Sequence, residues 1–232
     1  MSVRDDVELR VVDDPAGEAA EWLVRVAEAG GQIALSGGTT PQAAYERAAA
    51  LGGDWSRAVL WFGDERCVPP DHEHSNYRMA REALLRHLDP APEVHRMQGE
   101  LGPRAGADAY ERQLRVAAGG GVPQLDLALM GLGPDAHTAS LFPDQPALQE
   151  RRRLCVGVGE AGLAPYVARV TMTLPLFNAA REVVFLVAGA DKAEAMARAF
   201  AGPPTPAAPA SLVRPGSGRL VVLSDAAAAA RL

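Results

Sequence analysis

The segment Gly131-Leu-Gly-Pro-Asp-Ala-His-Thr-Ala-Ser-Leu-Phe-Pro143 has residue types suited to acid–base chemistry. A neutral imidazole, with an ordinary pKa of about 6.5, takes a proton from water near neutral pH. We therefore predict that His137 activates water for a hydrolysis and that Asp135, two residues earlier, orients its ring. Gly131 and Gly133 have backbone N–H groups suited to stabilising an oxyanion. A surface or capping role is the alternative for this histidine taken alone.

A glycine-rich turn lies in Ile33-Ala-Leu-Ser-Gly-Gly-Thr-Thr-Pro-Gln42, between an apolar run and an expected helix. Glycines let the backbone pack closely around an anion, and free N–H groups at a helix start attract negative charge. Pro41 suits a first helical position, with Thr39 or Thr40 as its cap. The alternative is a turn that binds nothing. The residues that we expect to hold a phosphate are Ser36, Gly37, Gly38 and Thr39.

Two cations are candidates to complete this anion site. Lys192 is the only lysine in the chain, and the sequence places it at the start of a helix that runs to residue 199. The helix dipole disfavours a cation there by roughly 0.3 to 1 kcal/mol, which a bound dianion would offset. Arg169, which follows a turn, is the second candidate, with a surface salt bridge as its alternative.

A charged turn, Gly63-Asp64-Glu65-Arg66, follows another apolar run. Arg66 is suited to a substrate oxygen or phosphate, and the carboxylates of Asp64 and Glu65 are suited to hydroxyl groups. A solvated turn is the alternative, because charged residues often follow a strand.

The elements that must position these residues alternate between apolar runs and stretches of helical periodicity, which is typical of βαβ units. One helix face has Ala19, Leu23 and Val26, and another has Tyr77, Ala80, Leu84 and Leu88. We predict an α/β fold with a mostly parallel sheet covered by helices on both faces, formed as one domain over residues 1–232. Ligands bind at the carboxyl ends of such strands. The expected strands are residues 7–12, 32–36, 58–62, 125–130, 154–158, 167–172, 183–188 and 220–223.

The composition of the chain limits the kinds of molecule that we expect it to bind. A net charge of −6 argues against nucleic acid and anionic membranes. The first twenty residues have no apolar run, so we expect neither a signal peptide nor a membrane span and predict a cytoplasmic protein. Cys67 and Cys155 have no C-x-x-C spacing and are expected to be free thiols. The sequence leaves the oligomeric state open between a monomer and a weak homo-oligomer.

Two other ligand classes match less well. Gly131, Gly133 and Ala136 satisfy the dinucleotide pattern G-x-G-x-x-A, but Pro143 leaves too little length for the helix that this pattern needs. Asp71-His-Glu-His74 has metal-ligand types without a third partner or a helical spacing. We therefore predict no metal and no cofactor.

The ordered motifs together resemble the glucosamine-6-phosphate isomerase/6-phosphogluconolactonase family over nearly the whole chain. They are Ser-Gly-Gly-Thr-Thr-Pro41, Gly-Asp-Glu-Arg66, Ser-Asn-Tyr77, the segment 131–143, Arg-Val-Thr171 and Lys192-Ala. The resemblance implies a Rossmann-like fold, no cofactor and hydrolysis of 6-phosphoglucono-1,5-lactone, a small sugar phosphate lactone, in the oxidative pentose phosphate pathway. It also implies that His137 is the base, that Ser36 to Thr39, Arg169 and Lys192 hold the phosphate, and that Asp64 and Arg66 line the sugar end.

Two alternatives remain within this resemblance. An amino-sugar-phosphate isomerase or deaminase would need a second carboxylate, and the family's deaminases resemble Asn-Glu-Pro where this chain has Leu-Phe-Pro143. A catalytically silent sugar-phosphate sensor is the other. It follows from Ala136, where the family usually has glycine and where a positive φ would cost alanine roughly 1 to 2 kcal/mol.

Overall fold

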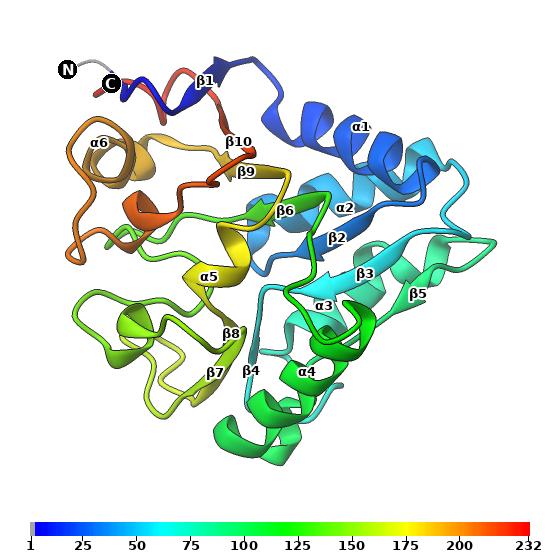
Figure 1. Cartoon of the computed structure of the whole chain (residues 1–232). Helices are drawn as coiled ribbons and strands as arrows, with labels where there is room; N and C mark the ends of the chain where they lie inside the picture. Colours follow the sequence, from blue (N-terminus) through cyan, green and yellow to red (C-terminus); the bar gives the residue numbers. More distant parts are fainter. Residues whose placement is uncertain (1–2) are drawn as a thin grey trace.

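The computed structural model describes residues 3–232, which form a seven-stranded sheet, a smaller three-stranded sheet and the helices around them (Figure 1). The large sheet is parallel throughout, with strand order β1-β10-β9-β6-β2-β3-β5. Its strands are β1 (Glu8–Val11), β2 (Gln32–Leu35), β3 (Val59–Phe62), β5 (Glu93–Val94), β6 (Leu127–Met130), β9 (Glu182–Val187) and β10 (Arg219–Ser224). The predicted α/β class with a mostly parallel sheet is confirmed.

The central strands are apolar on both faces because helices cover both sides of the sheet. All four residues of β6 are buried, and so are five of the six in β9. The helices are α1 (Pro15–Glu28), α2 (Thr39–Leu51), α3 (Asn76–Ala83), α4 (Pro103–Ala117), α5 (Leu174–Phe177) and α6 (Ala193–Phe200). Helix α2 packs against α1 and α3. Because crossovers between parallel strands are right-handed, this strand order places these three helices on one face of the sheet and α4, α5 and α6 on the other.

The smaller sheet is antiparallel and corrects the expected arrangement. It has the order β4-β8-β7, with β4 (Asp64–Arg66), β7 (Cys155–Val158) and β8 (Arg169–Met172). We predicted residues 154–158 and 167–172 as strands of one sheet. They lie instead in the second sheet, because β4 leaves the large sheet after Gly63 and pairs with β8, and β8 in turn pairs with β7.

The start of α2 and the end of α3 also differ from the prediction. Helix α2 begins at Thr39, its cap is Gly38 with φ 106°, and no side chain caps it. The expected cap at Thr39 or Thr40 is therefore wrong. Helix α3 ends at Ala83 and a 3-10 turn, Leu85–His87, follows, yet Leu84 is still buried as its spacing predicted.

One main cluster of buried apolar residues reaches from Val7 near the start of the chain to Ala228 near its end. A separate small cluster joins Phe142, Val158 and Ala161. Within residues 3–232, no helix has both the length and the apolar character that crossing a membrane requires.

Candidate active site

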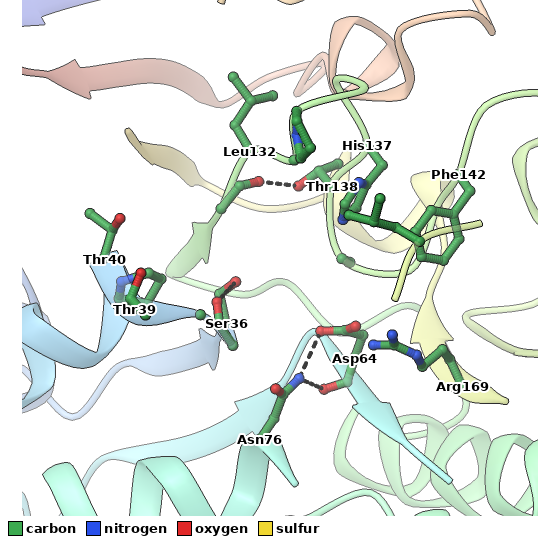
Figure 2. A pocket seen from close by; sticks show the side chains of 18 of the residues that line it. Ser36, Thr39, Thr40, Asp64, Asn76, Leu132, His137, Thr138, Phe142 and Arg169 are labelled. Atoms are coloured by element: carbon green, nitrogen blue, oxygen red, sulfur yellow. Dashed lines mark hydrogen bonds between the residues drawn. The ribbon is translucent and has the colours of Figure 1, made fainter. Parts of the chain in front are cut away.

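A cavity of about 250 Å³ is lined by the segments that follow β2, β3 and β6, at the carboxyl edge of the large sheet (Figure 2). Parallel strands bring the loops that follow them to the same edge, so segments far apart in the sequence meet there. Asp135 is behind this lining and reaches it through His137. The predicted residues that line the cavity are Ser36, Gly37, Gly38, Thr39, Asp64, Arg66, Gly131, Gly133, His137, Arg169 and Lys192.

The glycine-rich turn forms one wall and presents unpaired backbone donors. The N–H groups of the four residues from Gly37 to Thr40 find no acceptor among residues 3–232. Gly38 has φ 106°, a left-handed conformation that favours glycine. Since these groups also lie at the positive end of α2, the turn is suited to an anion.

Tyr45 fixes the start of this turn from within α2. Its fully buried hydroxyl accepts from the Ser36 N–H and donates to the Ser36 carbonyl, both at 2.8 Å. Burial raises the pKa of Tyr45 well above the usual value. The hydroxyl is therefore protonated and can make both bonds at once.

His137 faces the cavity with its side chain 17% exposed, and Asp135 orients it. Its Nδ1 lies 2.5 Å from Asp135 Oδ1, which leaves Nε2 as the nitrogen available to a substrate or water. Burial alone raises the pKa of Asp135. The hydrogen bond and charge of His137 lower this pKa by a larger amount, so the net shift is downward. The arrangement is that of a base held by a carboxylate.

The ring of His137 packs against two neighbours. The Phe142 ring lies on one side, with ring centroids 4.7 Å apart. The backbone of Gly133 approaches so closely that a Cβ there would lie 2.0 Å from His137 Nδ1. Only glycine at position 133 allows the ring to lie where it does.

Two alanines of this loop adopt left-handed backbone conformations. Ala136 has φ 65° and Ala139 has φ 49°. The positive φ considered for Ala136 from the sequence is therefore present. Each costs roughly 1 to 2 kcal/mol relative to an unstrained alanine, so neighbouring contacts must hold the loop. One such contact is the bond from Ala210 N–H to the Ala136 carbonyl, at 2.9 Å.

Three cations reach the cavity. Arg169 is 4% exposed, and it donates to the carbonyls of Pro165 and Val167. Burial lowers its pKa, and the nearby carboxylate of Asp64 opposes the shift. Figure 2 shows its guanidinium directed toward Asp64.

The other two cations, Arg66 and Lys192, are less fully paired. Arg66 donates from Nη1 to the His74 carbonyl, and its buried Nε has no partner among the described residues. The Lys192 ammonium lies 3.8 Å from an exposed carboxylate of Asp191, and its side chain is 24% exposed. It stands just before α6, as its position in the sequence indicated.

Glu65 does not line the cavity, so its expected contact with sugar hydroxyl groups is wrong. Its carboxylate accepts from the N–H groups of Arg66, Asn76 and Tyr77 and from the Ser75 hydroxyl, at 2.7 to 3.0 Å. Burial raises its pKa, and these hydrogen bonds oppose that shift. Glu65 therefore fixes the start of α3 to β4.

The N–H groups of Gly131 and Gly133, both expected to stabilise an oxyanion, differ in their hydrogen bonding. The N–H of Gly133 donates to the His137 carbonyl at 2.9 Å and is not free for a substrate. The N–H of Gly131 has no acceptor among residues 3–232. Gly133 thus contributes close packing, and Gly131 remains the candidate donor.

Neither of the other ligand classes gains support. No helix follows Gly131 before the 3-10 turn Pro146–Gln149, so the dinucleotide pattern lacks the helix that it requires. In the described part of the chain, no group of three or more metal-ligating side chains is found. The ring centroids of His72 and His74 lie 5.2 Å apart, and the His74 N–H donates to His72 Nδ1 at 3.1 Å.

Several lining residues were not singled out in the sequence. Asn76 belongs to the motif Ser-Asn-Tyr77, for which no role was predicted. Most of the others are neighbours of predicted residues. Leu163 and Ala164 come from an irregular segment without any signal. The additional lining residues are Thr40, Pro41, Asn76, Leu132, Pro134, Thr138, Ala139, Phe142, Leu163 and Ala164.

Fold and cavity together define an α/β protein in which a glycine-rich turn with unpaired N–H groups shares a cavity with a histidine–aspartate pair. Residues 10–222 match the family described as glucosamine-6-phosphate isomerases/6-phosphogluconolactonase. The chain belongs to this family.

Individual relatives agree with this membership. The chain is 45% identical over 206 residues to a 6-phosphogluconolactonase of Nostoc sp., covering 86% of this chain and 84% of that one. It is 44% identical over 207 residues to that of Synechocystis sp., with the same coverage. The solved 6-phosphogluconolactonase from Trypanosoma cruzi matches with TM-score 0.84 and 30% identity, covering 100% of this chain and 98% of that one.

Proposed function

We propose that this chain hydrolyses 6-phosphoglucono-1,5-lactone to 6-phosphogluconate, a step of the oxidative pentose phosphate pathway, with His137 as the base that activates water. The observation that carries the proposal is one cavity shared by the base and the anion-binding turn. A substrate with an ester carbonyl at one end and a phosphate at the other matches both. The names of the relatives support the same choice.

In this mechanism neutral His137 takes a proton from water through Nε2, while Asp135 holds Nδ1. The water oxygen bonds to the carbonyl carbon, and the negative charge passes to the carbonyl oxygen near the Gly131 N–H. As the ring C–O bond breaks, the imidazolium returns its proton to the leaving oxygen. The product is the open-chain acid.

The phosphate end is assigned to the turn from Ser36 to Thr39, together with Arg169 and Lys192. The unpaired N–H groups of the four residues from Gly37 to Thr40, together with the two cations, suit a dianion. Asp64 and Arg66 lie along the remaining wall. Binding at the phosphate end holds the lactone carbonyl near His137. This lowers the entropy cost of bringing the carbonyl and the base together.

A proton-release assay with the phosphorylated lactone tests the proposal, with unphosphorylated gluconolactone as the comparison substrate and a chelator as a second condition. We expect turnover that prefers the phosphorylated lactone and is unaffected by chelation. Binding without turnover would indicate a sugar-phosphate sensor. Loss of turnover on chelation would indicate a metal-dependent reaction.

A further inference from the structure

The side chain of Asp64 lies beneath the cavity with both of its oxygens engaged. It is 5% exposed. Oδ2 accepts from the Ser140 hydroxyl at 2.5 Å, and Oδ1 accepts from Asn76 Nδ2 at 3.1 Å. The two partners come from different sides of the cavity, the histidine loop and the start of α3. Asp64 therefore links these two segments.

Asn76 carries the link to the phosphate turn. Its amide also donates to the Asp64 carbonyl at 2.9 Å, so it is held at two points (Figure 2). It lies directly against the turn, since a Cβ at Gly37 would be 2.1 Å from Asn76 Oδ1. The backbone of Gly37 cannot move toward α3 without moving this amide.

Ser140 carries the link to the base. It is fully buried and lies three residues after His137, directly after the left-handed Ala139. Its N–H donates to the Thr171 hydroxyl at 3.3 Å, while its own hydroxyl reaches Asp64. Because the loop has a strained backbone, such external bonds determine where the imidazole lies.

We propose that Ser140 is a positioning residue and that the relay Asn76–Asp64–Ser140 couples phosphate binding to the placement of His137. This inference rests on the proposed function, because it takes the turn as the phosphate site and His137 as the base. When phosphate occupies the turn, the relay brings His137 to the separation from the turn that the substrate requires. A displacement of about 1 Å at a reacting group can cost on the order of 10²-fold in rate.

The first test compares Ser140→Ala with the wild type on phosphorylated and unphosphorylated lactone. Loss of one hydrogen bond to a carboxylate should lower kcat for the phosphorylated lactone by about tenfold. The kcat for the unphosphorylated lactone should change much less, because no phosphate is present to act through the relay. KM for the phosphorylated lactone should stay near its wild-type value, since the turn from Ser36 to Thr39 is unchanged.

Ser211→Ala is the matched control. Ser211 is also fully buried, and its hydroxyl bonds to the N–H and carbonyl of Thr205, neither of which lines the cavity. It should lower the melting temperature without changing either kcat. An equal fall in kcat on both substrates for Ser140→Ala, or a change in melting temperature alone, would overturn the coupling.

The second test is independent of turnover. Inorganic phosphate is titrated into both proteins while NMR follows the amide signals of Gly37 and Gly38 and the ring signal of His137. In the wild type the ring signal should shift with the amides along one binding curve. In Ser140→Ala the amides should give the same Kd, and the ring shift should be lost.

A ring signal that moves equally in both proteins, or in neither, would refute the relay. If the wild type does not hydrolyse the lactone, the proposed function fails in the first assay. The titration then still decides the relay.

Discussion

Replacing Gly133 by alanine should displace the base while leaving the fold in place. The new Cβ would lie 2.0 Å from His137 Nδ1 and 2.1 Å from Cε1, whereas ordinary contact begins near 3.4 Å. The ring must therefore retreat by about 1.4 Å. Its bond to Asp135, now 2.5 Å long, cannot survive such a shift. We expect kcat to fall by about 10²-fold, equivalent to roughly 2.7 kcal/mol.

Gly159→Ala is the control. A Cβ at Gly159 would meet nothing within 4 Å, and Gly159 does not line the cavity. Steady-state hydrolysis of the phosphorylated lactone, with melting temperatures, compares the two variants. Gly159→Ala should keep its kcat, and both should fold. A Gly133→Ala protein with nearly wild-type kcat would refute the placement of the ring.

Three further predictions concern the anion turn and the carboxylate behind the base. Tyr45→Phe should raise KM for the phosphorylated lactone about fivefold, from the loss of roughly 1 kcal/mol of hydrogen bonding. The control Tyr110→Phe loses a similar buried hydroxyl, bonded to the Phe62 N–H and the His95 carbonyl, and should lower only the melting temperature. Lys192→Ala should raise KM for the phosphorylated lactone and spare gluconolactone, and equal loss on both substrates would contradict its assignment. The third prediction uses the lowered pKa of Asp135, whose ionised form stabilises the fold above the unfolded value near 3.8, an effect lost as pH falls through the lower folded value. Urea unfolding should therefore show a stability gap between the wild type and Asp135→Asn that shrinks below pH 4, and a constant gap would be the contrary result.

The parallel sheet and the place of the site followed from the sequence because they depend on local pattern. The apolar runs before Ser36, Gly63 and Gly131 form β2, β3 and β6, and parallel pairing brings the loops that follow them to one edge. Because these three strands are neighbours in the sheet, their loops face a common space. The residues that line that space could therefore be predicted before its geometry.

The second sheet could not be predicted, because an apolar run does not specify its partner. The run that became β8 pairs with the short polar strand Asp64–Arg66, which shows no strand pattern of its own, and the run that became β7 pairs with β8. The roles of Glu65 and Ser140 were hidden for the same reason. The partners of Glu65 are 10 to 12 residues away in the sequence, apart from the N–H that follows it, and those of Ser140 are 31 and 76 residues away. Side-chain roles in loops depend on how distant segments close, and a single sequence does not specify that.

The most direct test of the account is the steady-state hydrolysis of 6-phosphogluconolactone by His137→Ala beside the wild type. We expect kcat to fall by about 10²-fold or more, because no imidazole is then present to take the proton from water. KM should change little, since the phosphate grip is untouched, and the melting temperature should remain close to that of the wild type. A variant that folds and keeps most of its kcat would show that another group activates the water.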